Sequence, residues 1–297
     1  MNNVQINFTI IIPHYNIPSL LIRCLNSIPV REDIQVVVVD DCSPDFELYK
    51  SKYVQLSRPY LELYQTPKGG SAGRARNIGI EKAKGKWVIF MDADDLFADN
   101  MEVLLDEIVD RNEDLLFFNY KSVYSDDLKK DAKRNYYQKY IQRYKKTGDD
   151  SDLRYNFESF WGKIIKRSLI ESNNILCDET RYGNDVYLSA QCGYFAKSIA
   201  VVDKVLFIVT ERAGSLASSQ FGDVGMSFNE MYIRTDVSTR KINLLYKVYP
   251  VCMESWLGLP LLKRYPLKSG MYILLTSIKY PKFLCFLVSR VFGKVMK

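Results

Sequence analysis

Histidine is almost absent from this chain of 297 residues, which contains only His14. One histidine cannot form a multi-histidine zinc site, and a Ser-His-Asp triad would have to be built around this single residue. His14 follows a predicted strand, where contact with a nucleotide and a purely structural role are both open. Zinc-dependent and serine-dependent hydrolysis are therefore poor explanations of the chain.

Several other signatures are also lacking. The six cysteines include no CxxC pair and lie in apolar or mixed contexts, which is typical of reduced core residues in a cytosolic protein. The N-terminus has no basic cluster followed by an apolar run, so neither a secretory signal nor an N-terminal anchor is expected. Gly69, Gly70 and Gly73 do not match the G-x-G-x-x-G pattern, and no P-loop pattern occurs. We therefore expect a cytoplasmic protein that does not bind dinucleotides and does not bind a nucleotide through a P-loop.

Acidic residues are missing from residues 255–297, which contain eight lysines and arginines. The rest of the chain carries 33 basic and 35 acidic residues, so the net charge of +6 comes entirely from this segment. Such a distribution argues against a general nucleic-acid-binding surface and favours a local anionic partner.

The basic segment has no apolar run near the roughly 20 residues that a membrane-spanning helix needs. A helix over residues 283–296 would instead place Arg290 and Lys294 on one stripe, with Lys297 following, beside a largely apolar remainder. This pattern predicts peripheral binding to an anionic membrane, on the inner face of the cell membrane. The alternative is a terminal helix docked on the protein's own core.

Apolar runs without helical period alternate with helical patterns over residues 1–120. The predicted strands are 8–12, 36–39, 61–64, 87–91 and 115–118, and the predicted helices are 18–28, 74–84 and 101–109. This alternation predicts an α/β fold with a mostly parallel sheet flanked by helices, and a nucleotide-binding half within residues 1–120.

The remainder of the chain is more varied. Residues 121–156 are charged and rich in tyrosine, and could form a partly mobile helix or hairpin that borders a second substrate, or a surface insertion without a binding role. Helices are predicted over 156–169 and 185–196, a strand over 199–209 and a mobile loop over 212–225. We expect a catalytic domain at 1–215, with its acceptor half at 121–215, and a C-terminal helical, membrane-associating extension at 216–297.

Acidic clusters follow two of the predicted strands. Asp40 and Asp41 end a run of four valines, and Asp92, Asp94 and Asp95 follow the strand at 87–91. Ligands of open α/β sheets bind at the carboxyl ends of the strands, so these carboxylates are expected around one crevice. Mg²⁺ or Mn²⁺ shared with a diphosphate would balance their charge. A bland alternative, a helix cap and a solvated turn, suits Asp99 and Asn100 better.

Together, several segments closely resemble the family 2 glycosyltransferases of the GT-A fold. They are IIIPHYN at 10–16, VDDCSPD at 39–45, ARNIG at 75–79, MDADD at 91–95, FWGKI at 160–164 and Asn184-Asp185-Val186. The likeness extends over roughly the first 215 residues, and the order of the segments makes it specific although each alone is weak.

The resemblance implies a donor site built from residues that follow the first two strands and from the third helix and the second acidic cluster. Its nucleotide-binding residues would be Pro13, Tyr15, Asn16, Asp40, Asp41, Arg76 and Asp92. Asp41, supported by Asp40, would accept hydrogen bonds from the base, and Arg76 would lie near the diphosphate or base. Asp92-Ala93-Asp94 resembles the DxD motif, with Asp92 at the ribose or sugar and Asp94 on the Mn²⁺ or Mg²⁺. Asp95 leaves the exact ligand open.

The resemblance also implies an acceptor site with Asp185 as the catalytic base and Trp161 as an aromatic platform for the acceptor sugar, on a helix at its border. A carboxylate that takes the proton of the acceptor hydroxyl, opposite the leaving diphosphate, gives inversion at the anomeric carbon. Asn184 stands where the family usually has glutamate, and Arg212 is the obvious clamp for the diphosphate.

The sequence thus predicts an inverting, metal-dependent glycosyltransferase. Its expected donor is a nucleotide sugar, with UDP-sugars favoured, and its expected acceptor is a lipid-linked glycan in bacterial surface polysaccharide synthesis. A nucleotidyltransferase is one alternative, but the segment after the first strand does not offer the basic, glycine-rich signature it would need. A catalytically silent, membrane-bound scaffold is another, and Asn184 is the feature that favours it.

Overall fold

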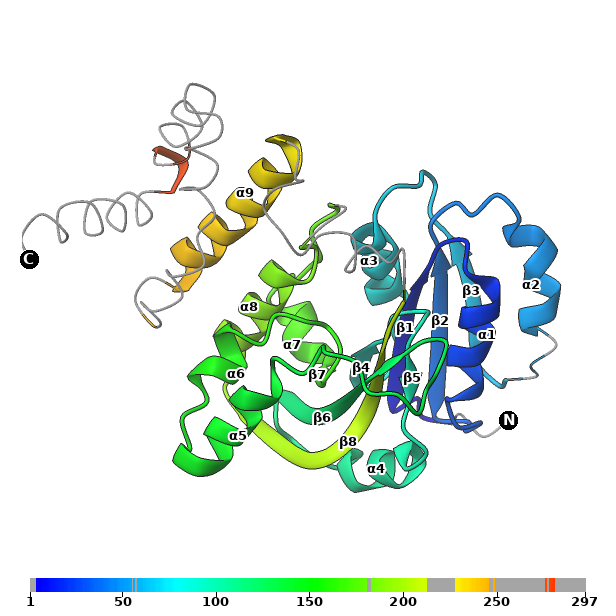
Figure 1. Ribbon diagram of the computed structural model, residues 1–297, viewed down its shortest axis with the longest axis horizontal. Helices are drawn as coiled ribbons and strands as arrows, with labels where there is room; N and C mark the ends of the chain where they lie inside the picture. Colours follow the sequence, from blue (N-terminus) through cyan, green and yellow to red (C-terminus); the bar gives the residue numbers. More distant parts are fainter. Residues whose placement is uncertain are drawn as a thin grey trace, which may run out of the picture.

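A computed structural model of the chain describes residues 4–54, 56, 58–180, 183–212, 228–245, 248, 276 and 278–280 (Figure 1). The strands are β1 (Phe8–His14), β2 (Ile34–Asp40), β3 (Leu61–Gln65), β4 (Trp87–Phe90), β5 (Leu96–Phe97), β6 (Leu115–Tyr124), β7 (Lys163–Lys166) and β8 (Ile199–Glu211). The helices are α1 (Pro18–Asn26), α2 (Phe46–Val54), α3 (Ala72–Lys82), α4 (Met101–Ile108), α5 (Gln138–Thr147), α6 (Ser151–Tyr155), α7 (Arg167–Ser172), α8 (Val186–Phe195) and α9 (Phe228–Leu245). All eight strands form one sheet in the order β3-β2-β1-β4-β7-β6-β8-β5.

The first block of the sheet, β3-β2-β1-β4, is parallel, as the alternating pattern predicted. Every residue of β1 and β2 is buried, which explains the continuous apolar runs. Val37 and Val39 pack against Ala75 of α3 on one face, whereas Val36 and Val38 join the main core. Helix α3 lies very close to the sheet, because a Cβ at Gly79 would come within 2.3 Å of the Ile11 side chain. These contacts fix the helix that carries Arg76.

The second block is mixed. Strand β7 is antiparallel to both β4 and β6, β6 runs parallel to β8, and β5 pairs antiparallel with β8. The helix predicted over 156–169 is therefore wrong over most of its length, because Lys163–Lys166 form a strand and α7 starts only at Arg167. Ile164 and Ile165 are buried within the sheet, and a short apolar run of this kind has no period that separates strand from helix.

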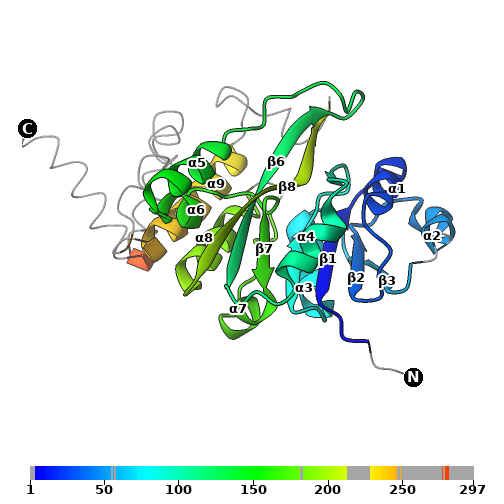
Figure 2. The ribbon, with the colours of Figure 1, turned by 90° about the horizontal axis from the view of Figure 1, so that it is seen from below.

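The segment at 121–156 contains the end of β6 followed by α5 and α6. Figures 1 and 2 show α5, α6, α8 and α9 gathered at the end of the molecule remote from β3 and α2. Helix α6 packs on α8, and α8 packs on α9. Sequence reasoning did not anticipate α2 or the two-residue strand β5, and for 121–156 it left a helix or a hairpin open without giving the bounds of α5 and α6.

The predicted tail helix at 283–296 and nearly all of the predicted loop at 212–225 lie outside the described residues. Among the helices that the structure does describe, none combines the length and the hydropathy required to cross a bilayer.

Candidate active site

The aspartates of the first acidic cluster accept hydrogen bonds from nearby residues of the protein. Asp40, at the end of β2, is fully buried and accepts hydrogen bonds from the Ser43 backbone N–H at 2.7 Å and from Ser43 Oγ at 2.6 Å. His14 Nε2 accepts from the Ile17 N–H at 3.2 Å, so its Nδ1 carries the proton that reaches Asp40 Oδ2 at 2.7 Å. Burial alone would raise the pKa of Asp40, but these hydrogen bonds outweigh it and lower the pKa.

This network shapes the turn after β1. Asn16 has a positive φ of 52°, and its backbone N–H donates to Ser43 Oγ at 2.7 Å. Pro13 is buried at the end of β1, whereas Tyr15 and Asn16 are exposed. Asp40 thus fixes the loop that carries the predicted nucleotide contacts.

Asp41 plays a similar part for the next loop. Its Oδ1 accepts from Thr66 Oγ1 at 2.9 Å, and its Oδ2 accepts from the backbone N–H groups of Gly70 and Ser71, both at 2.8 Å. Ser71 then caps α3, accepting from the Gly73 and Arg74 N–H groups. Asp41 therefore fixes the start of α3, and its contact with a base stays a prediction.

The second acidic cluster is bound differently. Asp95 is 2% exposed and accepts from the Thr210 backbone N–H of β8 at 2.6 Å, so it faces the core. Asp92 and Asp94 are instead partly open, and each pairs with an arginine: Asp92 with Arg76 at 2.5 Å and Asp94 with Arg212 at 2.9 Å. Burial, and next the charge of Asp92, raises the pKa of Asp94.

The pair Asp92 and Asp94 fits a divalent cation better than Asp95 does. Two carboxylates with accessible oxygens are the share of ligands that a protein usually gives to Mg²⁺ or Mn²⁺ when a diphosphate supplies the rest. Within the described ranges, no group of three or more histidine, cysteine, aspartate or glutamate side chains is arranged to hold a metal. A metal at this point would therefore depend on the oxygens of a bound substrate.

Arg76 joins the second acidic cluster to the predicted acceptor side. Its side chain donates to Asp92 Oδ1 at 2.5 Å and to Asn184 Oδ1 at 2.7 Å, and the residue is only 5% exposed. The guanidinium lies over the ring of Phe160, 4.3 Å from its centre. Sequence reasoning included Phe160 in the FWGKI segment but gave it no role, because only the fold brings it beneath Arg76. The glutamate-to-asparagine departure at 184 thus keeps an oxygen acceptor for Arg76 and removes a charge.

Asp185 lies at the N-terminal end of α8, and its side chain caps no backbone N–H of that helix. The residue is half-buried. The pKa of Asp185 is raised to about 6, mainly by burial; Arg76 and a backbone hydrogen bond oppose the rise, and the charges of Glu158 and Asp92 contribute to it. A carboxylate with this pKa is largely ionised at neutral pH and is still basic enough to accept a proton.

Trp161 does not offer an open aromatic face. The residue is 7% exposed and lies in a turn, and its ring packs 4.5 Å from Tyr120 and 5.5 Å from Tyr137, between ring centres. Tyr136 lies 6.5 Å from Trp161 and is 43% exposed. Burial raises the pKa of Tyr136; Arg134 opposes the rise, and the charges of Asp185, Glu211 and Glu158 contribute to it. The tyrosine-rich composition of 121–156 pointed to this segment but not to one residue.

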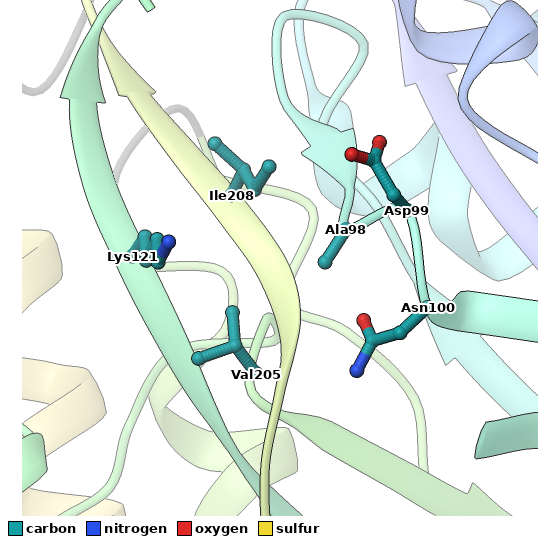
Figure 3. Close-up of a pocket in the computed structure, with 6 residues that line it drawn as sticks. All are labelled: Ala98, Asp99, Asn100, Lys121, Val205 and Ile208. Atoms are coloured by element: carbon teal, nitrogen blue, oxygen red, sulfur yellow. The ribbon is translucent and has the colours of Figure 1, made fainter. Parts of the chain in front are cut away.

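A shallow hollow of about 340 Å³ lies at the β5 edge of the sheet (Figure 3). Its lining residues are Ala98, Asp99, Asn100, Lys121, Val205 and Ile208. None of them is a predicted site residue. The predicted residues Asp92 and Asn184 meet at Arg76 instead.

Comparisons with known proteins identify the family of this chain. Residues 9–173, more than half of the chain, match the family model described as glycosyl transferase family 2. Glycosyltransferase GlyA of Streptococcus pneumoniae is 29% identical over 229 residues, which cover 72% of this chain and 32% of GlyA. Poly(ribitol-phosphate) beta-N-acetylglucosaminyltransferase TarS of Staphylococcus aureus is 28% identical over 230 residues, 73% of this chain and 38% of TarS. The chain thus spans about a third of the length of these two relatives.

Solved structures show the same fold. The crystal structure of S. aureus TarS 1-349 in complex with UDP-GlcNAc superposes with a TM-score of 0.59 at 23% identity, covering 81% of this chain and 71% of that one. The mannosyltransferase PcManGT from Pyrobaculum calidifontis, in complex with GDP-Man and Mn²⁺, gives a TM-score of 0.57 at 15% identity, covering 98% and 81%.

Proposed function

Because the chain belongs to glycosyl transferase family 2, we propose that it is an inverting, metal-dependent enzyme that transfers a sugar from a UDP-sugar to a surface or cell-wall polysaccharide. Membership of the family makes it a glycosyltransferase of the GT-A fold that acts on a nucleotide sugar. The name of TarS, a poly(ribitol-phosphate) glycosyltransferase, and its structure with UDP-GlcNAc support the polymer acceptor and the UDP-sugar donor.

The observation that carries the proposal is the bridge made by Arg76. One buried guanidinium contacts Asp92, the predicted sugar-binding aspartate, and Asn184, the neighbour of the predicted base. It thereby holds the donor side and the acceptor side of the site in one arrangement, as a direct displacement requires.

On the donor side, we assign the loop of Pro13, Tyr15 and Asn16 to binding the nucleotide. Asp40 and Asp41 would fix the loops that surround the nucleotide. Asp92 and Asp94 would hold the Mn²⁺ or Mg²⁺, which when bound stabilises negative charge on the departing diphosphate. Arg212, which pairs with Asp94, would donate to the diphosphate.

On the acceptor side, Asp185 would remove the proton from the attacking hydroxyl. The oxygen then attacks the anomeric carbon from the face opposite the diphosphate, so the bond to the sugar forms as the bond to the phosphate breaks, with inversion. We assign the aromatic platform for the acceptor to Tyr136 in place of Trp161, because Tyr136 is the more exposed of the two rings.

We also propose that the acceptor is lipid-linked and that the enzyme works at the inner face of the cell membrane. The basic, acid-free residues 255–297 support this placement through their attraction for anionic lipids. Loss of binding to anionic liposomes after removal of this segment is the expected result, and unchanged binding would contradict it.

Calorimetric titration with UDP, GDP, CMP and dTDP, with and without Mn²⁺, tests the donor site. We expect UDP to bind most tightly and to require Mn²⁺. In Asp94→Asn the affinity for UDP should fall, and adding Mn²⁺ should no longer raise it. The exposed Asp99→Asn serves as a matched control and should bind as the parent does. Binding that is indifferent to both metal and Asp94 would overturn the metal assignment. Tight binding without turnover on any acceptor would favour the silent scaffold.

A further inference from the structure

Helix α9 carries a buried lysine that contacts the loop next to the predicted acceptor site. Lys241 is 3% exposed, and its ammonium group pairs with the carboxylate of Glu158 at 2.5 Å. A lysine buried this deeply needs a partner, because an unpaired ammonium group in the interior is costly. Glu158 lies between α6 and β7, two residues before the Phe160 that supports Arg76.

Two further elements hold the same short loop. Ser189 of α8 donates from its hydroxyl to the Glu158 carbonyl at 2.6 Å, and Lys163 of β7 donates to the Phe157 carbonyl. Ser189 also donates its backbone N–H to the Asp185 carbonyl at 2.9 Å. Glu158 therefore lies beside the first turn of α8, where Asp185 is located.

The charged groups around this loop come from every element that packs on it. Those that interact with Asp185 are Arg76 of α3, Asp92 after β4, Glu158, Lys163 of β7 and the tyrosines 136 and 137. Those that act on or pair with Glu158 are Lys241 of α9, Lys163 of β7 and the tyrosines 136, 137 and 140. Burial lowers the pKa of Lys163 to about 7, so this lysine is only partly charged at neutral pH. Lys241 is consequently the main counter-charge of Glu158.

We propose that Lys241 is a positioning residue for the transfer reaction: through Glu158 it fixes the loop beneath the acceptor and balances the negative charge next to Asp185. Helix α9 is then a working part of the acceptor site, although it falls within the segment that the sequence assigns to a membrane-associating extension. The inference rests on the proposed role of Asp185 as the base.

The pH dependence of kcat/KM for the acceptor tests this role in the full chain. In Lys241→Met the charge of Glu158 is no longer balanced, and the acidic limb of the profile should move up by roughly half to one pH unit. Glu158→Gln should move the limb down, and the double variant should return it close to its position in the parent. Lys241→Arg, which keeps the charge, should leave the limb in place.

The neighbouring Arg240 provides the matched control. It also fixes α9, by donating to Asp178 and Asp236, but it makes no contact with Glu158. Arg240→Met should therefore leave the acidic limb where it is, whatever its effect on the melting temperature.

The outcomes separate this inference from the proposed function. An unmoved limb in both Lys241→Met and Glu158→Gln, with only a lower melting temperature, would reduce Lys241 to a structural residue and leave Asp185 as the base. If Lys241→Met does not fold, an unmoved limb in the half-exposed Glu158→Gln is enough to overturn the inference. Activity retained in Asp185→Asn would instead overturn the proposed base.

Discussion

The two acidic clusters follow neighbouring parts of the same sheet, yet their carboxylates are bound in opposite ways. Asp40 and Asp41 receive hydrogen bonds from backbone N–H groups and short polar side chains of the adjoining loops. Asp92 and Asp94 keep exposed oxygens, and their partners are the long side chains of Arg76 and Arg212. In the first arrangement a ligand could replace few of the hydrogen bonds that the carboxylates accept. In the second, an arginine can exchange its carboxylate partner for a phosphate.

This difference indicates a division of work between carboxylates that look alike in the sequence. Those held by backbone donors would give the site its shape, and those paired with arginines would meet the charge of the substrate. Asp95 belongs with the first kind despite its position in the second cluster, because it binds the backbone of β8. Asp185 belongs to neither kind, since no lysine or arginine in the part of the chain that the structure describes pairs with it directly, and burial keeps its pKa at about 6.

The largest effect is expected from Asp185→Asn, which removes the carboxylate that belongs to neither of these two kinds. Transfer should fall by about 10³-fold, as is typical for loss of a general base, with binding of UDP unchanged. The parent enzyme should lose activity below pH 6 as Asp185 becomes protonated. Rates measured between pH 4.5 and 9 with the parent and the variant check both statements, and a variant with full activity would contradict them.

The same substitution should stabilise the fold. The pKa of Asp185 is about 6 in the folded protein against an ordinary 3.8, so the folded state binds more protons and loses stability as pH rises through this interval. Asparagine avoids that loss, and the free energy of unfolding should rise by roughly 1–3 kcal/mol above pH 6, with no gain below about pH 4. Denaturant unfolding at pH 4 and pH 8 measures the difference.

Asp94→Asn and Asp95→Ala form the next pair. We expect Asp94→Asn to lower the Mn²⁺-dependent rate by about 10²-fold without lowering the melting temperature, because only a partly open carboxylate is lost. Asp95→Ala should instead cost about 2 kcal/mol of stability, because the buried Thr210 N–H loses its acceptor. Thermal melts and metal titrations of both variants distinguish the two kinds of carboxylate, and identical behaviour would erase the distinction.

Asp40→Asn should act on the fold before it acts on the chemistry. The amide cannot accept at both oxygens from His14 and Ser43, and we expect a loss of about 2–3 kcal/mol in the free energy of unfolding. The KM for the donor should rise with the disorder of the turn at Tyr15 and Asn16, while kcat at saturation changes little. A large fall in kcat with normal stability would place Asp40 among the reacting groups.

The smallest effect concerns the aromatic residues, where the same division between support and contact applies. Tyr136→Ala should raise the KM for the acceptor about three- to tenfold, leave the KM for the donor unchanged, and be rescued by Tyr136→Phe. Trp161→Phe, in the buried ring, should lower the melting temperature with a normal KM for the acceptor. The reverse pattern would return the platform to Trp161.

The sequence predicted the parallel block well because its strands are buried on both faces and its acids mark the ends of those strands. It failed at β7, where a four-residue strand lies between two partners that come from distant parts of the chain. It could not say which acid faces the core, because that depends on Thr210, 115 residues after Asp95. The pairing of Glu158 with Lys241, 83 residues apart, was equally inaccessible to local patterns.

The family match ends at residue 173, but the turn that holds Asp94 and Asp95 is anchored by Thr210 and Arg212. A chimaera that joins this donor half to the later residues of a relative supplies a backbone N–H for Asp95 only if the new strand has the register of β8. Asp94 loses its cation unless the relative also has a basic residue at the position of Arg212. Engineering of donor choice in this chain must therefore treat the turn and the end of β8 as one exchangeable unit.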